Sequence, residues 1–173
     1  MASATISVCK FVGTISLGLL TGLSTNLTTL TLPALLTLPT AITARSTHAY
    51  LTSRSRLLSS YLRHITTFSL FSAYLLSPRR ARHPYLLYTS IFTFLSGAGV
   101  DYGLALLSSR NTNKEGDGDE WRTIVELEAQ GEGVNGEQVR QAVERMRVRE
   151  GVRAGVAGVA FAMQVVGIWG DGA

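Results

Sequence analysis

Hydrophobic positions are concentrated in four long stretches, at residues 11–32, 57–76, 85–107 and 152–169. A helix needs about 20 largely apolar residues to cross a bilayer core, and each stretch approaches that length. The second stretch is the weakest because Arg63 interrupts it, although an arginine this close to a helix end can extend to the membrane interface. The pattern therefore predicts an all-α membrane protein with three or four transmembrane helices.

A long polar segment separates the third stretch from the fourth. Residues 111–119 are rich in glycine and polar side chains, which is typical of a flexible linker. Residues 137–149 place apolar side chains on one face and arginines opposite, which predicts a short amphipathic helix that either lies on the membrane surface or packs on the bundle. The expected parts are a membrane region over residues 1–107, a polar acidic loop over 108–150, and a last membrane helix with a short tail over 151–173.

The two signs of charge are unevenly distributed along the chain. All 12 acidic residues lie at or beyond Asp101, whereas the residues before it carry Lys10 and seven arginines. Soluble domains intersperse both signs over their surface, so the first hundred residues are not expected to form one. Residues 111–136 hold seven acids against two bases. The formal net charge of +4 therefore combines a basic membrane region with an acidic loop, and this loop is the segment long enough to reach a partner.

Residues suited to catalysis or metal binding are sparse and dispersed. Cys9 is the single cysteine, which excludes a disulfide within the chain and a cysteine-rich zinc site. His48, His64 and His83 all lie in the part without acids, so no histidine–carboxylate pair forms locally. Residues 131–136 spell G-x-G-x-x-G, but a dinucleotide site also needs a βαβ unit, and we interpret them as a flexible loop. We therefore expect no enzymatic activity, no cofactor, no metal and no nucleic-acid partner.

Glycines recur at helical spacing in the first and last apolar stretches. Gly18 and Gly22 form a G-x-x-x-G pair, and so do Gly151 and Gly155, with Gly158 following about one turn later. Such glycines let the backbones of two membrane helices approach closely, which is a main source of association energy in lipid. The pattern predicts helix packing at these positions, either within one chain or between two copies in a homo-oligomer.

Asp101 is the carboxylate that falls within an apolar stretch. A charge buried in a bilayer is a candidate functional residue, and Arg63 is the partner that the sequence suggests. Two interpretations stay open. Asp101 either meets the membrane interface near the end of its helix or belongs to a small channel or transporter.

The acidic loop contains a candidate docking motif. Asp119 and Glu120 precede Trp121, and Ile124 follows three residues later. This is the pattern of short peptides that add a strand to autophagy ubiquitin-like modifiers, with the two apolar side chains in pockets and the acids against a basic rim. The alternative is that Trp121 anchors the loop at the membrane surface.

Residues 82–88 read Arg-His-Pro-Tyr-Leu-Leu-Tyr and resemble the signature of the fungal autophagy-related protein 33 family. Three further segments are similar to the family in order and placement, at residues 7–9, 16–19 and 167–172. The resemblance covers both ends and the centre of the chain. It has no clear counterpart in the loop at 108–150 or in the arginine-bearing residues 45–56.

The resemblance implies a multi-pass protein of the mitochondrial outer membrane that is required for selective autophagy of mitochondria, or mitophagy, without enzymatic activity. A second branch of the family, which suppresses a cell-cycle ubiquitin-ligase mutation, shares the membrane layout, and the sequence does not separate the two. An early apolar stretch without an arginine-rich presequence is typical of a signal anchor and agrees with that location.

The partners expected on this basis are the lipid bilayer and proteins of the autophagy machinery, reached by the acidic loop on the cytosolic side. The alternatives from other classes are a small channel or transporter, and a structural membrane protein that shapes mitochondria through self-association.

Overall fold

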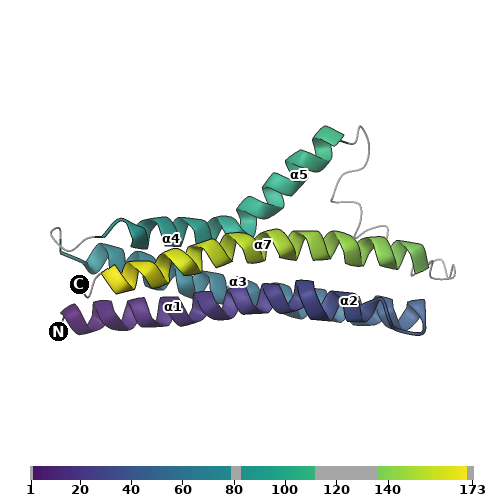
Figure 1. The fold of residues 1–173 in the computed structure, drawn as a ribbon, viewed down its shortest axis with the longest axis horizontal. Helices are drawn as coiled ribbons and strands as arrows, with labels where there is room; N and C mark the ends of the chain where they lie inside the picture. Colours follow the sequence, from purple (N-terminus) through teal and green to yellow (C-terminus); the bar gives the residue numbers. More distant parts are fainter. Residues whose placement is uncertain (1, 79–82, 112–135, 171–173) are drawn as a thin grey trace.

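The computed structural model describes residues 2–78, 83–111 and 136–170, and within these ranges every regular element is helical (Figure 1). The predicted all-α fold is confirmed there. The elements in chain order are α1 (Ala2–Asn26), the π-helical segment η1 (Leu27–Thr31), α2 (Leu32–Leu35), α3 (Ala41–Leu76), α4 (Tyr85–Phe94), the π-helical segment η3 (Leu95–Gly99), α5 (Val100–Asn111) and α7 (Gly136–Gly170).

The threonine-rich end of the first apolar stretch continues the helix from α1 through η1 into α2. Thr25 and Thr28 each donate a hydrogen bond from Oγ1 to the carbonyl four residues earlier, at 2.8 Å, so their polar groups are satisfied within the helix. Thr31 bonds to the carbonyl of Asn26, five residues earlier, which matches the wider turn of η1. Thr40 then caps α3, because its Oγ1 accepts a hydrogen bond from the Thr43 amide.

Two helices are longer than the sequence analysis expected. α3 has 36 residues and α7 has 35, which at 1.5 Å per residue gives about 50 Å, well beyond the roughly 30 Å of a bilayer core. α7 joins the predicted amphipathic segment to the last apolar stretch without a break. Val143 is buried against Leu32 and Leu35, so this segment packs on the bundle rather than forming a separate helix.

Three helical segments are long and apolar enough to cross a membrane: Ala4–Leu35, Tyr85–Leu107 and Gly136–Gly170. This agrees with the lower of the two predicted helix numbers. α3, which contains the weakest of the four apolar stretches, is not among them. Its arginines and its buried serines and threonines lower its hydropathy, although it packs along the full length of the bundle.

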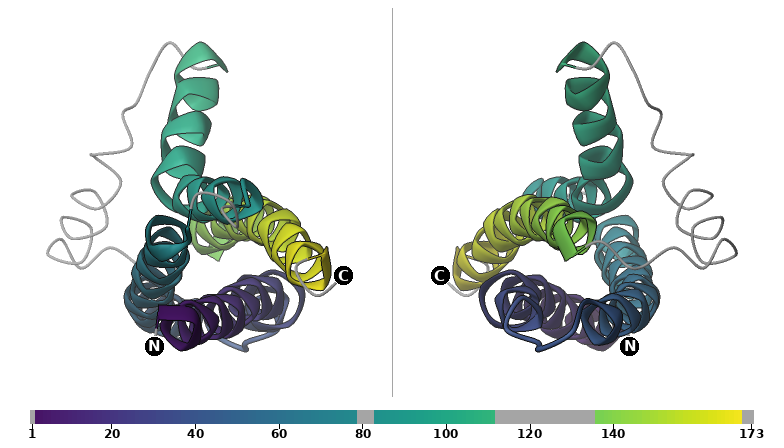
Figure 2. Two further views of the ribbon diagram at one scale, coloured as in Figure 1. Left: turned by 90° about the vertical axis from the view of Figure 1, so that its left-hand side faces the viewer. Right: turned by 90° about the vertical axis from the view of Figure 1, so that its right-hand side faces the viewer.

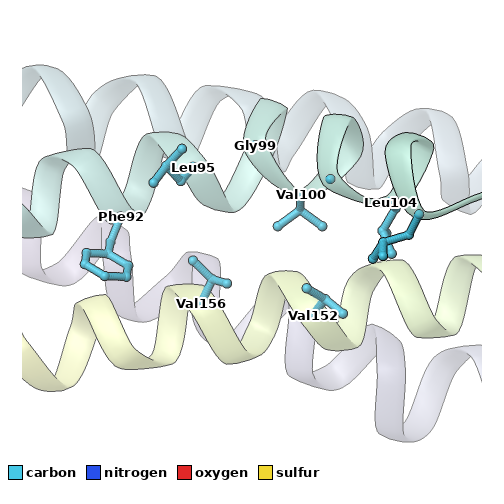
Figure 3. A pocket seen from close by; sticks show the side chains of 9 residues that line it. Phe92, Leu95, Gly99, Val100, Leu104, Val152 and Val156 are labelled. Atoms are coloured by element: carbon cyan, nitrogen blue, oxygen red, sulfur yellow. The ribbon is translucent and has the colours of Figure 1, made fainter. Parts of the chain in front are cut away.

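The helices form an elongated bundle with a bent fourth member. The α1–α2 rod, α3 and α7 run side by side along its length, and α4 packs against α3 and α7 over one half (Figures 1 and 2). At η3 the chain turns, and α5 leaves the bundle. The glycines Gly97 and Gly99 lie in this π-helical segment, a common site of helix kinks. The predicted third span is therefore bent, and an apolar groove opens between α5 and α7 (Figure 3).

The two halves of the bundle have different surfaces. We call residues 2–26, 57–76, 85–99 and 152–170 the apolar-surface half, and residues 27–56 and 136–151 the charged-surface half. In the apolar-surface half, Phe68, Val166 and Trp169 are 75%, 71% and 83% exposed. Exposed large apolar side chains are solvated well by lipid and poorly by water. This half therefore has the surface of a membrane bundle.

Candidate functional site

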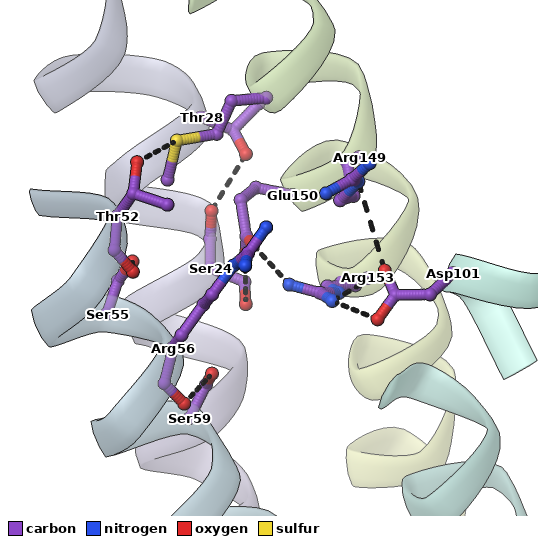
Figure 4. Close-up of polar contacts among 11 residues, drawn as sticks. Ser24, Thr28, Thr52, Ser55, Arg56, Ser59, Asp101, Arg149, Glu150 and Arg153 are labelled. Carbon is purple, nitrogen blue, oxygen red and sulfur yellow. Dashed lines mark hydrogen bonds and ion pairs between the residues drawn. The ribbon is translucent and has the colours of Figure 1, made fainter. Parts of the chain in front are cut away.

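A cluster of charged side chains forms where α4 bends into α5 (Figure 4). Asp101 lies in the first turn of α5, and Nη2 of Arg153 in α7 donates to both of its carboxylate oxygens at 2.7 Å. Nε of Arg149 lies 3.8 Å from the same carboxylate. Because α5 has few contacts with the rest of the bundle, this ion pair is a main polar link between α5 and α7.

The same arginine also binds a second carboxylate on its inner side. Nη1 of Arg153 donates to Oε1 of Glu150 at 2.6 Å, and Oγ of Ser24 in α1 donates to Oε2 at 3.2 Å. Glu150 and Arg153 are only 5% and 7% exposed. We call Ser24, Asp101, Arg149, Glu150 and Arg153 the charged cluster. It ties α1, α5 and α7 together at the border between the two halves of the bundle.

Arg63, the partner that the sequence suggested for Asp101, lies on α3 beside the π-helical segment η3. Its guanidinium occupies the space beside Gly97, where an added Cβ atom would overlap it. Arg153 takes the place predicted for Arg63, so that prediction was wrong. The reason is geometric: pairing depends on how α3 and α7 are rotated about their axes. In this arrangement Arg153 of α7, and not Arg63 of α3, is within hydrogen-bond distance of Asp101.

A buried glutamine forms a second polar link, deeper in the apolar-surface half. Gln164 is fully buried in α7, and its Oε1 accepts a hydrogen bond from Oγ1 of Thr89 in α4 at 3.1 Å. Its Nε2 donates to Oγ1 of Thr14 in α1 at 3.4 Å. The sequence analysis did not single out Gln164. Its signal was visible, because an amide is rare within an otherwise apolar stretch and must find a partner in lipid.

The glycines selected from the sequence divide into two groups. Gly18, Gly151 and Gly158 face the α1–α7 contact, where Cβ atoms would lie 3.1 Å from the Phe161 ring, 3.5 Å from Thr28 and 3.7 Å from Thr21. Gly22 and Gly155 are exposed, and a Cβ atom there would meet nothing within 4 Å. Packing within one chain therefore uses three of the five positions. Association of two copies through the other two stays a prediction.

Some predicted features lie outside the described residues. The candidate docking motif of Asp119, Glu120, Trp121 and Ile124 is among them, and so is most of the predicted flexible linker. Across the described ranges, no group of three or more histidine, cysteine, aspartate and glutamate side chains is placed to hold a metal ion.

Three of the four segments that carry the family resemblance meet at one end of the bundle, through Cys9, Tyr85 and Gly167. The Tyr85 ring, at the start of α4, packs with Cys9 of α1 on the cluster formed by Leu70 and its neighbours. The same ring lies against Gly167 near the end of α7, where an added Cβ atom would overlap it. Segments far apart in the sequence therefore form one packed unit around Tyr85.

Comparison with known proteins identifies the family. The family model described as Autophagy-related protein 33 matches residues 1–120, more than half of the chain. The chain belongs to this family. It is also 37% identical over 183 residues to Autophagy-related protein 33 of Gibberella zeae, covering 97% of this chain and 92% of that protein. No solved structure matches the chain.

The family match and the charged cluster overlap only in part. Within the autophagy-related protein 33 match lie Asp101, Ser24 and the whole bend at η3. Arg149, Glu150 and Arg153 lie beyond residue 120, in the part that aligns with the Gibberella protein but not with the family model.

Proposed function

We propose that the protein is a non-enzymatic, multi-pass protein of the mitochondrial outer membrane that acts in the selective autophagy of mitochondria. The observation that carries this proposal is the match over 97% of the chain to a protein named Autophagy-related protein 33. The fold supports the membrane location, because three helices are long and apolar enough to span a bilayer and large apolar side chains cover one half of the bundle.

The dimensions of the bundle support a role in protein contacts. Helices of about 50 Å exceed a hydrocarbon core of roughly 30 Å, which supports our proposal that the charged-surface half projects out of the membrane. Its helices expose arginines from two directions, with Arg54 and Arg56 on α3 and Arg140 and Arg147 on α7. Such a projection, together with the acidic loop, offers contact surfaces of both signs to other proteins.

Deleting the protein tests the proposed function directly. We expect delivery of a mitochondrial matrix reporter to the vacuole to fall in starvation and in stationary growth, while delivery of a cytosolic reporter stays unchanged. The cytosolic reporter is the control for bulk autophagy. Unchanged mitochondrial delivery in both conditions would exclude the function.

We further propose that Trp121 and Ile124 bind a ubiquitin-like autophagy modifier by β-strand addition. Changing both to alanine should abolish binding of the full-length protein to the purified modifier. The matched control is Val125→Ala, which truncates a neighbouring apolar side chain outside the first and fourth positions that the motif places in pockets. Binding that survives the double change would remove the motif from consideration.

Recruitment of cytosolic machinery requires the loop between α5 and α7 to face the cytosol. Protease added to intact mitochondria should cut the chain within residues 112–135, leaving an amino-terminal fragment that contains α1 to α5. Cleavage that occurs only after the outer membrane is opened would contradict this topology and the docking proposal together.

A further inference from the structure

An apolar groove of about 420 Å³ lies between the bent helix and α7 (Figure 3). Its volume falls within the roughly 300–1,000 Å³ of typical small-molecule sites. Every residue that lines it has an apolar side chain or none: Phe92, Leu95, Gly99, Val100, Gly103, Leu104, Leu107, Val152 and Val156. We call this the α5–α7 groove.

The groove exists because α5 leaves the bundle and because glycines line its wall. If α4 continued straight through η3, its next turns would lie on α7 and cover Val152 and Val156. Gly103 contributes no side chain, and a Cβ atom placed there would meet nothing within 4 Å. The space beside Gly103 is therefore open to an elongated apolar ligand.

One end of the groove meets positive charge. Arg149 lies about one turn before Val152 on the same face of α7, and its side chain is 28% exposed. Two carboxylates lie nearby, those of Asp101 and Glu150. Three arginines surround them, namely Arg63, Arg149 and Arg153, so the formal charge of the five side chains is +1. A ligand with an apolar chain and an anionic head matches this arrangement.

The groove also lies at the border between the apolar-surface and charged-surface halves. If the apolar-surface half fills the hydrocarbon layer, this border falls at the level where acyl chains end and phosphate groups begin. An amphiphile held there keeps its chain in the hydrocarbon layer and its head in the headgroup layer. Depth, shape and charge therefore select the same class of ligand.

We propose that the α5–α7 groove binds one acyl chain of an anionic phospholipid, whose phosphate group is bound by Arg149. The inference rests on the membrane location in the proposed function. It adds to that function a specific lipid, bound in the groove that the bend at η3 opens. A bound lipid would fill the space that α5 leaves open and fix the direction in which α5 departs.

Lipid retention by the purified full-length protein tests this site. The protein is incubated in mixed micelles with equal amounts of phosphatidylglycerol and phosphatidylcholine, and bound lipid is counted by native mass spectrometry. We expect one retained phosphatidylglycerol and little phosphatidylcholine. Equal retention of the two lipids by the unchanged protein would overturn the proposed role of Arg149.

Two pairs of variants locate the lipid. Gly103→Leu should abolish retention by filling the groove, whereas Gly22→Leu, an exposed glycine with equally open surroundings on α1, should not. Leu107→Gln puts a polar group into the groove wall and should reduce retention, whereas Leu106→Gln changes an exposed neighbour that does not line it. Retention by Gly103→Leu and Leu107→Gln equal to that of their controls would overturn the site.

A third pair separates the head from the chain. Arg149→Gln should remove the preference for phosphatidylglycerol, and Arg147→Gln, an exposed arginine on another face of α7, should keep it. This result does not depend on the autophagy assay. Unchanged lipid selectivity in Arg149→Gln would contradict the lipid site alone. Unchanged mitochondrial delivery after deletion of the protein would contradict the proposed function alone.

Discussion

In the charged-surface half, Leu32, Leu35 and Val143 form a buried cluster, and the outside carries charged side chains together with large apolar ones such as Leu30 and Ile42. In the apolar-surface half, leucines such as Leu17 and Leu70 are fully buried together with the polar Gln164, and phenylalanines, leucines and valines also face outward. Both halves are built from the same three long helices. The halves differ in their outer surfaces, because exposed charged side chains lie in the first, whereas Lys10, Arg63 and Arg153 of the second are all at least partly buried.

The comparison shows which forces hold each half together. If the charged-surface half projects into water as proposed, burial of its leucines is favourable, because burying apolar area lowers the free energy against a polar solvent. Lipid gives no such drive, so an apolar-surface half that lies in lipid would depend on close packing and on polar links such as that of Gln164. The charged cluster lies at the border between the two halves, where a bilayer around the apolar-surface half would end.

The largest effect is expected from removing the arginine that joins the two halves. Arg153→Ala leaves Asp101 and Glu150 without their shared cation, and breaking a buried pair in this way costs about 3–5 kcal/mol of the free energy of unfolding. Denaturant titration in detergent, followed by circular dichroism, measures the loss. Arg147→Ala, at an exposed site on the same helix, should stay within about 0.5 kcal/mol of the unchanged protein. Similar losses for the two variants would contradict the role of the cluster.

Matched truncations in the two halves test the difference in solvent. Leu32 and Leu70 are both fully buried, the first in the charged-surface half and the second in the apolar-surface half. Leu32→Ala should cost about 2–5 kcal/mol, as core truncations in water do. Leu70→Ala should cost less in lipid vesicles, since only packing is lost there. The free energies of unfolding of both variants in vesicles decide this, and an equal loss would place both halves in the same solvent.

Glycine substitutions test where the helices touch. A Cβ atom at Gly13 would lie 2.6 Å from Cδ2 of the buried Leu70, so Gly13→Leu forces α1 away from α3. We expect a loss of about 1–3 kcal/mol, the usual cost of overpacking. Gly155→Leu, at an exposed position of α7, should leave the midpoint of thermal unfolding in detergent unchanged. A lower midpoint for Gly155→Leu would reveal a contact that a single chain does not make, such as one with a second copy.

The smallest effect is expected from the polar link within the apolar-surface half. Gln164→Leu keeps the side-chain volume nearly constant but removes the hydrogen bonds to Thr89 and Thr14. Single side-chain hydrogen bonds in membrane bundles contribute about 0.6 kcal/mol on average and at most about 1.7 kcal/mol. Thr89→Val, measured alone and together with Gln164→Leu, isolates the Thr89 bond in a double-mutant cycle. A coupling energy of zero would show that this bond adds nothing to stability.

Much of the fold was predictable from local sequence. The first apolar stretch runs from α1 through η1 to the start of α2, and the other three lie in α3, in α4 with η3 and α5, and in α7. The helical class follows from their length. Among the glycines that the pattern selected, Gly18, Gly151 and Gly158 lie where α7 packs on α1 and η1. The length of α7 was missed, because its arginine-rich first half looks like a separate surface helix until Leu32 and Leu35 are placed against it.

The sequence by itself determined the helical spans, the separation of charge along the chain, and the family, since each is a property of neighbouring residues or of motifs. Only the tertiary structure decided that the third span bends at η3, that Asp101 pairs with Arg153 instead of Arg63, and that Gly22 and Gly155 face outward. These features depend on how each helix is rotated and offset against the others. The packing of all the helices sets that rotation, and no single segment encodes it.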